Sequence, residues 1–138
     1  MKFEKLPPDI GAHLLNQMEG CGSEAEKDFI YWLVESECPQ PEEERLRILS
    51  TLICQERYSA KRKFKADFRL LTIQDTPVFV EWEGGIGTHK SAYRSYTGYI
   101  SHANKYNWLT ANGFMVLRLC AKNRDTFWEL WGHLRGGE

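Results

Sequence analysis

The chain has 138 residues, of which 42% are hydrophobic and 27% are charged, and its net charge is −1. This length predicts a single domain over 1–138 with enough apolar residues for a core, and the charged content excludes a disordered chain. No apolar run reaches the length of a membrane span and the first residues lack a signal-peptide core, so we expect a cytoplasmic protein without membrane contact.

Three helices are expected before the first strand, over 10–19, 24–37 and from residue 42 onward. Ser23 and Glu26 match a capping box at the start of the second helix. Because Glu26 also lies at the margin of that helix's apolar face, its carboxylate either caps the helix or reaches toward a pair of carboxylates in the strands that follow, those of Asp67 and Glu81. The spacing leaves both roles open.

Three strands in meander order are expected next, over 54–58, 63–71 and 77–83. Apolar and polar residues alternate in the second and third of these runs. This alternation predicts that each of the two strands has one buried face and one polar face.

A hairpin loop at 72–76 sets a register in which Asp67 faces Glu81 on the polar side of the two strands. Like charges directly opposite each other are destabilising, and a chain tolerates them when a cation belongs between them. Carboxylate oxygens suit a hard divalent ion, so Asp67 and Glu81 are predicted to bind Mg²⁺ or Mn²⁺. Glu83 points the same way and either adds a ligand or pairs with Lys65. The competing interpretation is a solvated strand face with ordinary alternating charges.

Positive charge is concentrated around this predicted metal site. Residues 1–56 carry five Lys/Arg and twelve Asp/Glu, whereas 57–138 carry thirteen and seven. The glycine-rich loop 84–98 is unusually long and adds further cationic groups. Such groups suit a polyanionic backbone, although a charged hairpin edge and a flexible surface loop are the alternatives. The residues expected to contact nucleic acid are Lys61, Arg62, Lys63, Lys65, His89, Lys90 and Arg94.

The C-terminal part is expected to contain a helix, a buried strand and a last helix. The first helix, over 99–112, ends at Gly113 as the residue after its C-cap, and its spacing allows Lys105 to extend toward the sheet. The continuous apolar run 114–120 is typical of a buried strand, and the aromatic-rich segment 124–134 of a core helix.

Four cysteines occur without CxxC spacing, at Cys21, Cys38, Cys54 and Cys120. Neither a zinc site nor a disulfide framework is therefore indicated. We expect these cysteines to be reduced and mostly buried.

Several short motifs follow one another in an order that resembles the restriction-endonuclease-like PD-(D/E)XK nuclease superfamily. The first motif is the basic-aromatic-Asp-Phe segment Arg62-Lys-Phe-Lys-Ala-Asp67-Phe. The others are the strand Val80-Glu-Trp-Glu-Gly-Gly85, His89 in the loop and Lys105-Tyr-Asn107 in the helix. The chain is most similar to a group of small nucleases common in phages and prophages. The match covers roughly 23–120.

The resemblance implies an α/β (α+β) fold with a restriction-endonuclease-like core. Its central four-stranded mixed sheet is flanked by helices in the order αβββαβ. An N-terminal helical extension over 1–22 and a C-terminal helix over 121–138 complete the expected single domain. The superfamily's acidic pair corresponds to Asp67 and Glu81, and its helix-borne acid to Glu26, with Glu24 as the rival.

The chain departs from the superfamily pattern in two places: Glu83 stands where a catalytic lysine is usual, and Ala103-Asn104 replaces the more acidic residues expected just before Lys105. Members with the first change often supply the lysine from the following helix, where Lys105 stands. The implied activity is metal-dependent hydrolysis of DNA by an endonuclease, with branched or nicked DNA as one substrate class. Alternatives are a non-catalytic nucleic-acid-binding protein and a phage accessory protein on the same fold. Homodimer formation stays open.

Overall fold

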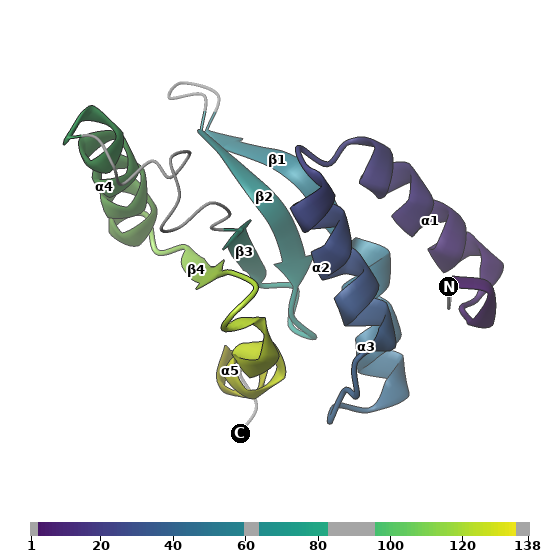
Figure 1. The fold of residues 1–138 in the computed structure, drawn as a ribbon. Helices are drawn as coiled ribbons and strands as arrows, with labels where there is room; N and C mark the ends of the chain where they lie inside the picture. The colour runs from purple at the N-terminus through teal and green to yellow at the C-terminus, as the bar shows by residue number, and fades with distance from the viewer. Residues whose placement is uncertain (1–2, 60–63, 83–95, 135–138) are drawn as a thin grey trace.

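The computed structural model describes residues 3–59, 64–82 and 96–134, and its fold is α+β with one four-stranded sheet (Figure 1). The strands lie in the sheet in the order in which they occur in the chain. The first three pair antiparallel as the predicted meander, and the fourth pairs parallel to the third. The strands are β1 (Ile53–Ser59), β2 (Phe64–Leu71), β3 (Pro77–Trp82) and β4 (Met115–Leu119).

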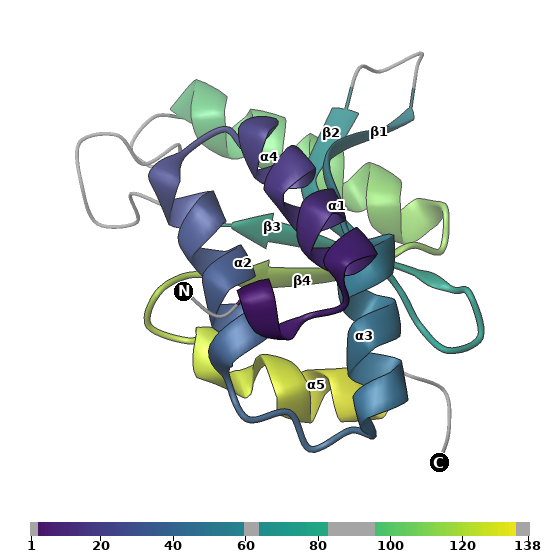
Figure 2. The same ribbon diagram turned by 90° about the vertical axis from the view of Figure 1, so that its right-hand side faces the viewer.

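Helices cover both faces of this sheet. In Figures 1 and 2, α1, α2 and α3 lie on one side and α4 lies on the other. Among the described residues, no helix is both long enough and apolar enough to cross a membrane. The helical elements are η1 (Phe3–Lys5), α1 (Pro8–Glu19), α2 (Glu24–Glu35), α3 (Glu42–Thr51), α4 (Tyr96–Ala111), η3 (Arg124–Thr126) and α5 (Phe127–Leu134).

The main core lies between the sheet and the α1–α3 layer, and α5 closes it with aromatic side chains. Phe29 of α2 is at its centre, with its ring centroid 5.1 Å from that of Phe68 in β2 and 5.7 Å from that of Phe127 in α5. All three side chains are fully buried. Burial of each contributes about 1.5–3 kcal/mol, which fixes α2 against the face of β2 that the alternation predicted to be apolar.

A smaller core lies on the opposite side of the sheet, where Ala66, Phe79 and Leu109 pack together. The sequence predicted that β3 has one polar face, and this prediction was wrong. Phe79 is 3% exposed and Glu81 is 4% exposed, because α4 packs over that side of the strand. A strand covered on both faces is typical of the centre of a sheet with helices on either side.

The predicted register between β2 and β3 is confirmed, since Leu71 pairs with Pro77 and Phe68 with Val80. The loop between the strands spans 72–76 as expected, and its Asp75 takes a left-handed backbone conformation with φ 63°. Asx residues adopt that conformation more readily than most, which suits this position in the turn.

Two helix ends also match their predicted signals. Ser23 caps α2 by accepting a hydrogen bond from the Glu26 backbone N–H at 3.2 Å. Gly113 follows α4 with φ 76°, and the Phe114 N–H donates to the Leu109 carbonyl at 3.0 Å, as in a Schellman motif. α4 itself begins at Tyr96, three residues earlier than the sequence predicted.

Candidate functional site

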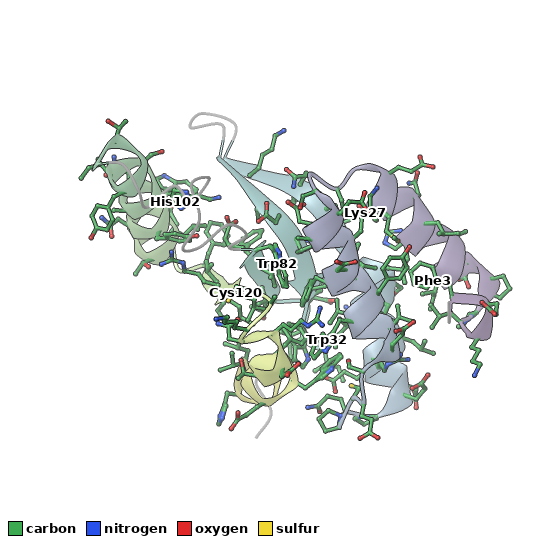
Figure 3. The ribbon with its side chains drawn as sticks, in the orientation of Figure 1. Phe3, Lys27, Trp32, Trp82, His102 and Cys120 are labelled. Atoms are coloured by element: carbon green, nitrogen blue, oxygen red, sulfur yellow. The ribbon has the colours of Figure 1, made fainter. Side chains whose placement is uncertain are left out.

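The candidate site lies where β2 and β3 separate. Among the described residues, the recorded pairing of these strands ends at Phe68–Val80, one position before Asp67 and Glu81. There the Asp67 carboxylate takes the place of a backbone acceptor, since its Oδ2 accepts the Trp82 N–H at 2.7 Å. Figure 3 shows Trp82 near the middle of the molecule, between the α2 and α4 layers. The predicted register thus brings both acids to one end of the strand pair.

Glu81 is joined to α4 through Lys105. The Lys105 Nζ donates to Glu81 Oε1 at 2.7 Å and to the Lys65 carbonyl oxygen at 2.8 Å. The two side chains are 17% and 6% exposed, so this ion pair is largely removed from water. The helix-borne lysine therefore reaches the sheet, and its charge offsets that of a carboxylate whose burial would otherwise be costly.

Glu26 makes a capping contact at the start of α2 and, in the segments that the structure describes, is connected through Gln55 to Asp67, though not to Glu81. Its Oε1 accepts the Gly22 N–H at 2.9 Å in front of α2, which is a capping contact. The same oxygen accepts a hydrogen bond at 3.0 Å from the side-chain amide of Gln55 in β1. That amide also lies 3.4 Å from Asp67 Oδ1, so Gln55 bridges the helix-borne acid to the strand-borne acid.

Gln55 was missed by the sequence analysis. Its neighbours Cys54 and Glu56 pair with Phe68 and Ala66, the neighbours of Asp67, and its backbone is left-handed with φ 55°, which is uncommon for a residue with a side chain. Residues held in such conformations concentrate at functional sites. Its only sequence signal is an amide side chain in the strand expected beside that of Asp67. The positive φ of Gln55 cannot be predicted from the sequence.

The proximity of the acids affects the protonation of Glu26. Burial raises the pKa of its carboxyl above the ordinary 4.5, and the negative charge of Asp67 raises it further. Hydrogen bonds from Gly22, Gln55 and Ser23 act in the opposite direction. A carboxyl whose pKa is raised in the folded protein keeps its proton up to a higher pH there than in the unfolded chain.

This shift predicts a pH-dependent effect of Glu26→Gln. Because the pKa of Glu26 is higher in the folded state, its contribution to stability falls as pH rises from about 4.5 through the folded value. Glutamine does not titrate, so the thermal midpoint of the variant should rise relative to wild type across that window. Thermal unfolding in a series of buffers measures the difference. Glu24→Gln in the same helical turn is the control, and an identical pH trend in both variants would contradict the assignment.

The other predicted residues are placed only in part. Lys65 is exposed, and its backbone carbonyl anchors Lys105. The rival acid, Glu24, points to solvent, where it pairs with Lys27 at 3.1 Å with its side chain 88% exposed. The predicted residues outside the described part of the chain are Lys61, Arg62, Lys63, Glu83, His89, Lys90 and Arg94.

Asp67 and Glu81 offer carboxylate oxygens, the type of ligand that a magnesium-type ion prefers. A carboxylate oxygen has two lone pairs, so the hydrogen bonds to Asp67 are compatible with a metal on the same group. Within the described ranges, no group of three or more His, Cys, Asp or Glu side chains is placed to hold a metal. Mg²⁺ is commonly bound through one or two carboxylates with water and substrate phosphate as its other ligands.

Comparison with family models, curated proteins and solved structures found no match to the chain.

Proposed function

We propose that the protein is a divalent-metal-dependent DNA endonuclease with a restriction-endonuclease-like core. The observation that supports the proposal is that Asp67 and Glu81 directly follow the last pair of β2 and β3, with Lys105 bonded to Glu81 and with Gln55 connecting Asp67 to Glu26. Carboxylates that could hold a divalent ion, with a lysine bonded to one of them, are groups that suit metal-assisted hydrolysis of a phosphodiester.

Asp67 and Glu81 would hold the ion. When bound there, Mg²⁺ or Mn²⁺ would lower the pKa of a water ligand and polarise the scissile phosphate. Asp67 is set in position by the Trp82 N–H at 2.7 Å, which fixes the orientation of its carboxylate. The carboxylate of Glu81 is held by the hydrogen bond that it accepts from Lys105. Both acids are thus held in place before substrate arrives, and such preorganisation favours catalysis.

Lys105 would act on the phosphate or on the attacking water. Its ammonium is held between Glu81 Oε1 and the Lys65 carbonyl, so the charge lies beside the acidic pair. A cation there offsets the negative charge that develops on the phosphoryl oxygens in the transition state. Lys105 would thereby replace the lysine that the superfamily usually has at the position of Glu83.

The DNA backbone would be held by the cationic residues that the sequence analysis singled out. Lys65 is the described member of this group and is exposed on β2. The segments 61–63 and 89–94 carry the other members in the sequence. Contacts of this kind position the backbone without reading its sequence, so we expect a substrate chosen by shape.

A non-catalytic nucleic-acid-binding protein on the same fold is the second candidate. The ion pair between Lys105 and Glu81 favours it, because this contact satisfies the buried carboxylate without any metal. In that case the acidic pair has only a structural role, and binding would be independent of divalent ions.

The two candidates are separated by incubating the purified protein with supercoiled plasmid, single-stranded DNA and a four-way junction. Each substrate is tested with Mg²⁺, with Mn²⁺ and with EDTA. The proposal predicts cleavage with either metal and none with EDTA. DNA binding without nicking, at equal affinity in all three conditions, would instead support the non-catalytic protein.

A further inference from the structure

We propose that Cys21 and Cys54 are a redox-modification site that forms a reversible intramolecular disulfide. Their Sγ atoms lie 3.3 Å apart in a thiol–thiol hydrogen bond. The cysteines are separated by 33 positions in the chain, and both are free and half-buried. The sulfurs need to approach by only about 1.3 Å to reach the S–S bond length of about 2.05 Å.

Both cysteines are held by the same helix. The Cys54 N–H donates to the Gln17 side-chain oxygen at 2.8 Å, and the Cys21 N–H donates to the Met18 carbonyl at 3.2 Å. Gln17 and Met18 are adjacent in α1, so the loop after α1 and the start of β1 are fixed relative to each other. This shared anchor keeps the two thiols together in the reduced protein.

The hydrogen bond also divides the chemical roles of the two thiols. It lowers the pKa of Cys21, whereas the same bond and burial raise the pKa of Cys54. The thiolate is the nucleophile in disulfide exchange, so we expect Cys21 to attack first and Cys54 to resolve the mixed disulfide.

The oxidant belongs to the class of low-molecular-weight disulfides, with glutathione disulfide as its common member. The Cys21 thiolate attacks one sulfur of this molecule, forms a mixed disulfide and releases one glutathione thiolate. Cys54 then loses its proton and attacks the Cys21 sulfur, which expels the second glutathione thiolate. Two protein thiols are oxidised to one disulfide, and one glutathione disulfide is reduced to two thiols.

The disulfide would form next to the residues that bind Glu26 in the candidate site. Cys21 precedes Gly22, whose N–H donates to Glu26, and Cys54 precedes Gln55, whose amide donates to the same carboxylate. The disulfide therefore links the two segments that hold Glu26. Its formation does not depend on the proposed nuclease function, since only the thiols and their anchor are involved.

The test is to incubate the full chain with mixtures of reduced and oxidised glutathione, block free thiols with N-ethylmaleimide, and map peptides by mass spectrometry. We expect one cross-linked species joining the Cys21 and Cys54 peptides, with Cys38 and Cys120 alkylated. The oxidised protein should unfold at a temperature higher by on the order of 5–10 °C, because the cross-link restricts the unfolded chain. Dithiothreitol should reverse both changes.

Matched variants complete the test. Cys21→Ser and Cys54→Ser should each abolish the cross-link and the rise in unfolding temperature, whereas Cys38→Ser with Cys120→Ser should retain both. The wild-type peptide map decides the question even if a variant folds poorly. Equal alkylation of all four thiols, a cross-link between another pair, or a mixed disulfide at Cys21 that Cys54 does not resolve would overturn the proposal.

Discussion

Asp67→Asn is expected to reduce metal-dependent DNA cleavage by at least about 100-fold, because it removes one of the two charges that we propose hold the ion. Asparagine retains a side-chain oxygen that can accept the Trp82 N–H, so the strand end should keep its geometry. The rate of plasmid nicking under single-turnover conditions, with Mg²⁺ in excess, measures the effect.

The control for this variant is Asp75→Asn. Asp75 lies in the same hairpin and is exposed, and its carboxylate pairs with Arg47 outside the candidate site. It should cleave DNA at the wild-type rate, while Asp67→Asn should still bind DNA in an anisotropy assay. Normal cleavage by Asp67→Asn, or an equal loss in both variants, would contradict the assigned role of Asp67.

Lys105→Met is expected to lower the free energy of unfolding by about 2–4 kcal/mol at pH 7. The substitution leaves Glu81 charged and 4% exposed without the cation that donates to its Oε1. The cost falls near the lower end of the range for broken buried pairs, because the Lys105 side chain is 17% exposed and some water reaches the pair. Urea denaturation at fixed temperature gives the value.

A double mutant separates the ion pair from the packing of the lysine stem. Lys105→Met combined with Glu81→Gln should recover most of the lost stability, because the stranded charge is gone. Lys27→Met, which breaks the exposed pair with Glu24, should change stability little. If the double mutant is as unstable as Lys105→Met alone, the ion pair is not the source of the loss.

The features that the sequence predicted are those determined by local patterns. The period-two alternation and the short loop at 72–76 are sufficient to set the β2–β3 register, and that register places Asp67 and Glu81 at one strand end. The capping box at Ser23 and the glycine after α4 likewise depend on neighbouring residues alone.

The features that the sequence did not predict depend on contacts between distant segments. The polar side of β3 is buried because α4 folds back over Phe79, and no pattern within the strand contains that information. Gln55 contacts Glu26 from a residue with a left-handed backbone, and the sequence indicates neither the contact nor the conformation. The contact between Cys21 and Cys54 requires α1 to hold a loop and a strand together, which Cys spacing cannot indicate.

Asp67 and Glu81 binding one divalent ion is the central claim, and Mn²⁺ titration followed by NMR tests it most directly. Paramagnetic broadening falls steeply with distance from the ion, so it locates the ion along the chain. At substoichiometric Mn²⁺, the amide signals of Asp67, Glu81 and Trp82 should broaden first, and Asp67→Asn should abolish this effect. Broadening that begins instead at the acidic first turn of α3, with those three signals unchanged, would contradict the account.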